Sequence, residues 1–238
     1  MPYIESKYME KYTYNEIRCF LQVTEFNAKQ AAELIRHDIE WRNNNLPVRL
    51  RELEDILKSE KVYLYGADKH LNPCFYVKPN HEKGSYYPGE DLELEDYERY
   101  MIYVFEKLHD TISLLGFSSQ YVVLLDMNNG ELRMDILDMI ERLTCYHYPN
   151  KIAKIHIVRF DAAKLSFDHK RRLKDKEFFA DRVQLYDESY KTNLLRAFDP
   201  YELSALYGGF SKKPYDLREI MKLKSVKKFI LSMLSLTI

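Results

Sequence analysis

Histidines are the first candidates for chemistry in this sequence, because an imidazole can bind a metal ion or act as a base. No two of the seven have the spacing of a His-x-x-x-His metal motif. A P-loop, a Gly-x-Gly-x-x-Gly motif and the Gly-x-Ser-x-Gly motif of hydrolases are also absent. We therefore predict no catalytic residue, no metal and no cofactor, and we expect that the protein is not an enzyme. The histidines are His37, His70, His81, His109, His147, His156 and His169.

Asp126 is the acidic residue best placed for catalysis, because it ends the apolar run 121–125. In α/β folds, catalytic groups often follow the carboxyl ends of such strands. The next residues, Asn128-Asn129-Gly130, are typical of a turn. We expect Asp126 to stabilise this turn rather than to catalyse a reaction.

A basic cluster, Lys170-Arg171-Arg172 with Lys174, lies in the second half of the chain. Residues 150–238 contain 19 Lys and Arg against 11 Asp and Glu, although the whole chain has a net charge of −1. Such a surface favours an anionic partner, either a membrane or a nucleic acid. No nucleic-acid recognition motif accompanies the cluster. We predict peripheral binding to an anionic membrane surface and no nucleic-acid binding; the alternative is an ordinary polar surface with uneven charge.

Length and composition indicate one large domain, since the chain has 238 residues and 46% of them are hydrophobic. The cysteines, Cys19, Cys74 and Cys145, are odd in number and far apart, so we expect free thiols in a reducing compartment. The first residues lack the apolar region of a signal peptide, and no apolar stretch reaches the roughly 20 residues of a membrane span. We expect a cytoplasmic protein that can also lie peripherally at organelle membranes. No feature of the sequence indicates an oligomeric state.

The first part of the chain has helical periodicity. Apolar residues recur at helical spacing in 14–23, 28–42 and 48–58, and Asn27 is placed to cap the second of these helices. We predict a small all-helical segment over residues 1–58.

The second part alternates strand-like and helix-like stretches, which predicts an α/β fold with about five mostly parallel strands and flanking helices. We predict this domain over residues 59–215, followed by a C-terminal helix over 216–238 that packs on the domain or lies at a membrane surface. The expected strands are 62–65, 74–77, 121–125, 154–160 and 182–186. The expected helices are 92–115, 132–143, 189–197, 200–206 and 216–234.

Several short motifs stand in the order and at the spacing of one known family. The series includes Glu40-Trp41-Arg42, Val123-Leu124-Leu125-Asp126, His147-Tyr148-Pro149 and Tyr207-Gly208-Gly209. From about Tyr14 to Gly209 the chain resembles the CRAL-TRIO family of lipid-binding domains.

This resemblance implies a function and a place for it. Members hold one hydrophobic ligand between the sheet and a mobile gate helix, so a lipid, for example a phospholipid exchanged at membranes, is the expected partner. The corresponding sheet positions are Phe75, Val123, Leu125 and Ile157, and the corresponding gate positions are Leu165 and Phe167.

The resemblance also implies headgroup positions, and here the sequence departs from members that transfer phosphatidylinositol. Asn150, followed by Lys151, stands where those members have a Glu, and Phe179 stands in place of a Thr. Arg182 replaces a Lys and keeps its positive charge, and an arginine can bind phosphate with two parallel hydrogen bonds. We therefore expect a ligand other than the inositol lipid.

The gate stretch, residues 163–174, is more charged than that of typical members and forms no wide apolar face. Two explanations stay open: the gate lies on an anionic membrane, or the pocket has shrunk. The second leads to an alternative function, in which the fold serves as a ligand-free protein-interaction or membrane-recruitment module.

Overall fold

The computed structural model describes residues 11–80, 92–113 and 120–211, with side chains described up to residue 107 in the second range. The predicted C-terminal segment 216–238 lies outside the described residues.

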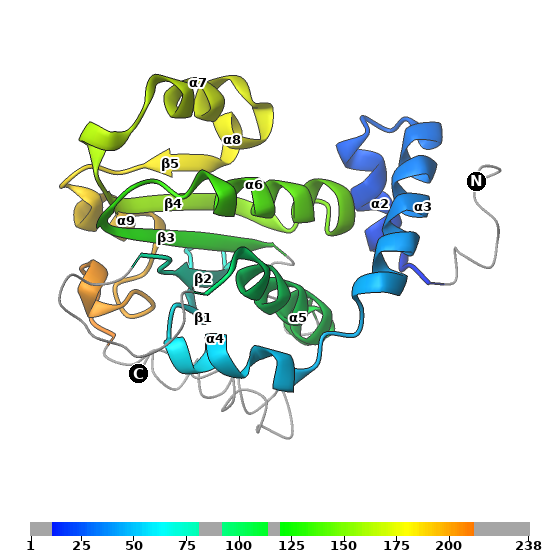
Figure 1. Cartoon of the computed structure of the whole chain (residues 1–238), viewed down its shortest axis with the longest axis horizontal. Helices are drawn as coiled ribbons and strands as arrows, with labels where there is room; N and C mark the ends of the chain where they lie inside the picture. The colour runs from blue at the N-terminus through cyan, green and yellow to red at the C-terminus, as the bar shows by residue number, and fades with distance from the viewer. Residues whose placement is uncertain (1–10, 81–91, 114–119, 212–238) are drawn as a thin grey trace.

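Two capped helices lie at the start of the described chain and confirm the predicted N-terminal helices. In α2 (Tyr14–Val23), Thr13 and Glu16 form a reciprocal capping box. In α3 (Ala28–Asn45), the Asn27 side chain accepts hydrogen bonds from two backbone N–H groups of the first turn. The third predicted helix is divided into a 3₁₀ turn, η1 (Leu50–Leu53), and α4 (Glu54–Ser59). Figure 1 shows α2 and α3 beside the end of α6, next to the sheet.

A five-stranded sheet forms the centre of the molecule, as predicted. Its order is β1-β2-β3-β4-β5, and every neighbouring pair is parallel except β1 with β2. The strands are β1 (Val62–Ala67), β2 (Pro73–Val77), β3 (Tyr121–Gly130), β4 (Ile152–Phe160) and β5 (Val183–Leu185).

Helices cover one face of this sheet, which we call the α5–α6 face. Each parallel strand from β2 to β5 lies next to the strand before it in the chain, so right-handed crossovers place all connecting helices on the same side. The connections are α5 (Leu94–Ser113), then α6 (Met134–Arg142) with the π-turn η2 (Leu143–His147), then η3 (Ala162–Lys164), α7 (Phe167–Asp175) and α8 (Glu177–Arg182). In Figure 1, α7 and α8 lie beside β5, at the sheet edge.

The opposite face, called the α9 face, packs against α9 (Tyr190–Ala197) and the following segment with η4 (Ala205–Tyr207). Side chains alternate between the two faces along each strand: Val123 and Leu125 belong to the core of the α5–α6 face, and Val122 and Leu124 to the core of the α9 face. Both sides of β3 are buried, which explains its continuous apolar run.

Two predicted elements differ from the structure. Asn128 and Asn129 do adopt left-handed backbone angles, but the strand continues through them and β3 ends only at Gly130, which pairs with Phe160 of β4. The predicted helix over 200–206 is wrong, because this stretch forms turns that end in η4. Here the backbone comes so close to itself that a Cβ at Gly209 would lie 1.9 Å from the carbonyl oxygen of Leu203.

Asp126 has the structural role that the sequence predicts. Its Oδ1 accepts the N–H of Asn128 at 2.9 Å, which stabilises the turn. Its two oxygens also accept a bidentate pair of hydrogen bonds from Arg159, and Oδ2 accepts the Tyr207 hydroxyl at 2.6 Å. Asp126 is fully buried, so these donors are what stabilise its charge there.

A second buried carboxylate, Asp38 in α3, joins the N-terminal helices to the rest of the fold. It accepts hydrogen bonds from Tyr12 and Arg42, both at 2.7 Å, and lies 3.0 Å from Nδ1 of His147 in η2. Arg42 also pairs with Glu106 of α5 at 2.7 Å. The contact therefore fixes α3 against two elements of the α/β domain.

Acid should destabilise the fold through His156, a buried residue of β4 whose ring lies 2.9 Å from the Tyr186 hydroxyl. Burial lowers the pKa of His156 to about 4. The unfolded chain, with a histidine pKa of about 6.5, thus takes up a proton that the folded chain does not. We expect the free energy of unfolding to fall by about 3 kcal/mol between pH 6.5 and pH 4 from this residue.

Urea unfolding at a series of pH values measures this contribution. His156→Gln should be less stable at pH 7 but should lose less stability on acidification. An equal acid slope in both proteins would contradict the assignment to His156.

Candidate functional site

The four sheet residues predicted to line a pocket lie together on the α5–α6 face. Phe75 pairs in register with Val123, and Leu125 with Ile157, so they form two adjacent rows across β2, β3 and β4. Period-2 alternation of strands predicts this shared orientation. All four side chains are 0% exposed, because other parts of the chain cover them.

Residues 162–182, which we call the cover segment, contribute side chains to the same apolar core. Leu173 of α7 and Phe179 of α8 are buried in the same core, and Leu165, a predicted gate residue, packs against it while partly exposed. The other predicted gate residue, Phe167, is not part of this core: it starts α7 with its side chain 78% exposed.

Two ion pairs to α6 hold the outer side of the cover segment. Arg172 pairs with Asp138, and the Lys176 Nζ lies 2.6 Å from Glu141 Oε2. These side chains are 21 to 42% exposed, and exposed pairs contribute about 1 kcal/mol or less each. Ion pairs therefore add little to the apolar contacts that hold the cover segment down.

Three of the predicted headgroup residues lie at the end of the sheet where the parallel strands β4 and β5 begin, which we call the polar edge. Asn150 and Lys151 directly precede β4, and Arg182 directly precedes β5. The Arg182 Nε donates to the carbonyl oxygen of Ile152 at 3.2 Å, and its guanidinium stacks 4.7 Å from the Phe178 ring. Within the described part of the chain, Arg182 forms no ion pair with a carboxylate.

The oxygens of Asn150 already accept hydrogen bonds from another residue of the chain. It adopts a left-handed backbone angle, and its side-chain and backbone oxygens accept hydrogen bonds from Gln120, at 2.9 and 3.1 Å. Phe179, the fourth headgroup candidate, is 0% exposed in the apolar core and belongs with the cover rather than with the polar edge.

Tyr121 is a candidate that the sequence reasoning missed. It begins β3 on the α5–α6 face, beside the polar edge, and its ring packs 5.0 Å from Phe75. The side chain is fully buried, yet its hydroxyl has no hydrogen-bond partner among the described residues, and burial raises its pKa. The signal in the sequence was a tyrosine at the head of an otherwise aliphatic run.

At the opposite end of these strands, Asp126 is already satisfied by hydrogen bonds from Arg159 and Tyr207. Among the described residues, no three or more His, Cys, Asp or Glu side chains are arranged to bind a metal ion. No helix in the described ranges combines the length and the apolar character of a membrane-spanning segment. The candidate site thus consists of the apolar sheet positions Phe75, Val123, Leu125 and Ile157, which we call the floor, together with the cover segment and the polar edge that carries Arg182.

Known proteins share sequence or fold with this chain. The family description that matches residues 57–209 is "CRAL/TRIO domain". Two proteins of Arabidopsis thaliana, the phosphatidylinositol/phosphatidylcholine transfer proteins SFH14 and SFH9, are 22% and 20% identical over 84% and 88% of this chain. The chain spans about two fifths of their length, 38% and 41%.

The fold is also found among solved structures. The crystal structure of Sfh5 matches with a TM-score of 0.59 and 16% identity, over 90% of this chain and 82% of that one. The CRAL/TRIO match covers more than half of the 238 residues, and the chain belongs to the CRAL/TRIO domain family.

Proposed function

We propose that the protein carries one lipid between the α5–α6 face of its sheet and the cover segment. The observation that supports this most strongly is the difference in polarity between the floor and the cover segment. The floor is wholly apolar, whereas the cover reaches it through few apolar side chains and is charged outside. A lipid would enter when residues 162–182 move away from the sheet.

Free energies favour such an exchange. Leu173 and Phe179 contribute about 1.5–3 kcal/mol each through burial, so displacing them costs roughly 3–6 kcal/mol. A long acyl chain gains about 0.8 kcal/mol per CH₂ on leaving water, on the order of 10 kcal/mol in all. A bound tail can therefore offset the loss of the cover contacts.

Polar groups at the edge would bind the other end of the ligand. The unpartnered Tyr121 hydroxyl costs about 1–3 kcal/mol as it stands, and a polar atom of the ligand would remove that cost. Arg182 retains N–H donors beyond those used for backbone carbonyls, and these suit a phosphate. The ligand favoured by this edge is a phospholipid.

Purified protein should contain lipid if this proposal is correct. We expect native mass spectrometry to show one lipid per chain, and organic extraction to release a phosphate-bearing species. Vesicle assays should show transfer of that lipid. Protein without lipid that also fails to transfer it would contradict the proposal.

Arg182→Ala tests the polar end in the same assay. Loss of a charged hydrogen-bonding partner, worth about 1.5–3 kcal/mol, should weaken binding of a phosphate-bearing lipid about tenfold to hundredfold. Binding of diacylglycerol, which lacks the phosphate, should be unchanged and serves as the control for folding. Equal losses for both lipids would mean that Arg182 is structural.

The cover segment also supports peripheral binding to an anionic membrane. Phe167 is exposed on α7, and Lys170, Arg171 and Lys174 are exposed on the same short helix. An aromatic ring beside basic side chains suits the interface of an anionic bilayer. Contact at this helix would place the cover where lipid leaves the membrane.

Replacing Lys170 and Lys174 together by Gln should weaken binding to phosphatidylserine vesicles about 30-fold, since each basic residue contributes about 1 kcal/mol. Vesicle sedimentation measures this, and added salt should weaken the wild type more than the variant. The matched control replaces Lys29 and Lys107, exposed lysines of α3 and α5. Equal effects of the two double variants would contradict the assignment.

A second function, a ligand-free interaction module, is favoured by one observation. Phe75, Val123, Leu125 and Ile157 are completely covered by the chain itself. If this packing is permanent, the sheet face has no room for a lipid. Mass spectrometry of the purified protein separates the two functions.

A further inference from the structure

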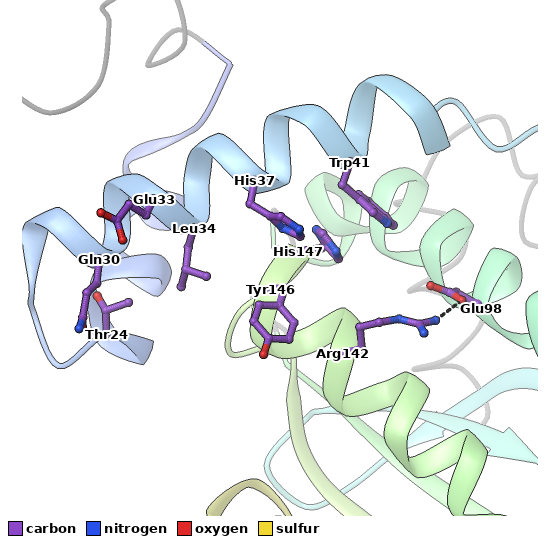
Figure 2. A pocket seen from close by; sticks show the side chains of 10 residues that line it. All are labelled: Thr24, Gln30, Glu33, Leu34, His37, Trp41, Glu98, Arg142, Tyr146 and His147. Atoms are coloured by element: carbon purple, nitrogen blue, oxygen red, sulfur yellow. Dashed lines mark hydrogen bonds and ion pairs between the residues drawn. The ribbon is translucent and has the colours of Figure 1, made fainter.

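A groove of about 890 Å³ lies outside the lipid site, between α3 and the α6–η2 segment (Figure 2). One wall is a single face of α3, with Leu34, His37 and Trp41 at helical spacing. The other wall carries Arg142, Tyr146 and His147. This volume falls within the roughly 300–1,000 Å³ typical of small-molecule sites.

Stacked rings form the middle of the groove. The His147 ring lies 3.9 Å from the Trp41 ring at an interplanar angle of 16°, and 5.4 Å from the His37 ring at 21°. Tyr146 meets His37 edge-on at 6.2 Å. The His147 ring of the second wall thus lies between the His37 and Trp41 rings of α3, and the three rings are nearly parallel, as Figure 2 shows.

A buried contact with Asp38 holds the His147 ring of this stack in place. His147 is buried, and its Nδ1 lies 3.0 Å from the fully buried Asp38, which also accepts hydrogen bonds from Tyr12 and Arg42. By contrast, His37 is exposed and Tyr146 is 47% exposed. The groove therefore presents preformed ring surfaces, which reduces the ordering cost of binding.

Figure 2 shows polar and charged side chains toward the two ends of the groove. At one end Arg142 donates to Glu98 at 2.5 Å, so this cation is already neutralised. At the other end lie Thr24, Gln30 and Glu33, and the rings of His37, Tyr146 and His147 lie between the two ends, with Leu34 beside His37. Ring stacking is the specific interaction that these walls can offer.

We propose that this α3–η2 groove binds a small molecule through a planar aromatic ring that stacks on His37 and extends the His37–His147–Trp41 series. Leu34 and Tyr146 would enclose the edges of that ring. Aromatic pairs contribute about 0.5–1.5 kcal/mol beyond the burial of their area, so flat rings are preferred over saturated rings of equal size. The inference is independent of the lipid function.

Trp41 makes the test direct, because it is the single tryptophan of the chain and lies in the groove. Its indole N–H gives one cross-peak in a ¹⁵N–¹H correlation spectrum. The probes are 2-naphthol and its saturated counterpart, decahydro-2-naphthol. We expect 2-naphthol to shift the Trp41 peak saturably and to bind about two- to twelvefold more tightly than the saturated alcohol.

His37→Leu keeps the apolar bulk and removes the ring, so it should abolish the preference for 2-naphthol. Tyr146→Leu should weaken 2-naphthol binding by a smaller factor. The matched control, His70→Leu, changes an exposed histidine in the β1–β2 turn and should have no effect. Equal binding of both alcohols, an unmoved Trp41 peak, or an unchanged preference in His37→Leu would overturn the proposal.

Discussion

The α5–α6 face of the sheet is apolar across β2, β3 and β4, and such a surface has to be kept out of water. Helices α5 and α6 are crossovers between adjacent parallel strands and cannot leave it without breaking the fold. The cover segment differs, because it ends in the short edge strand β5 and is held by few apolar side chains and by exposed ion pairs. In the proposed function, either the cover segment or a bound lipid tail keeps this apolar surface out of water.

Buried charged contacts hold the frame around the cover segment, whereas partly exposed ion pairs hold the segment itself. Asp126 binds β3 to β4 and to the closing Tyr207 segment, and Asp38 binds α3 to η2. Removing one partner of such a buried charge typically costs about 3–5 kcal/mol, several times the value of an exposed ion pair. Motion is therefore expected at residues 162–182 before it is expected in the frame around them.

Local patterns in the sequence predicted much of this frame. Asn27 marked the start of α3 as a helix cap, and the run 121–125 marked a strand buried on both faces. The family resemblance named Val123 and Leu125 as site positions, and strand alternation explains why the two share one face. These features depend on neighbours in sequence, which is why periodicity and capping residues reveal them.

Features that depend on distant neighbours were not predicted. His147 and Asp38 are 109 residues apart, and nothing local in either segment indicates their contact. The resemblance placed Phe167 in the gate, but the structure exposes it, since the short charged α7 turns its Leu173 inward instead. Tyr121 looked like part of a plain apolar run, and only the packing around it leaves its hydroxyl unpartnered.

The central claim is that the cover segment must leave the sheet for lipid to enter. Cysteines introduced at Asp138 and Arg172, whose side chains pair across α6 and α7, can be joined by a short crosslinker that a reductant cleaves. Cys19 and Cys145 would first be replaced by Ser, because both are partly exposed. We expect the joined protein to lose lipid transfer between vesicles and to regain it on reduction. Unchanged transfer by the joined protein would contradict the claim.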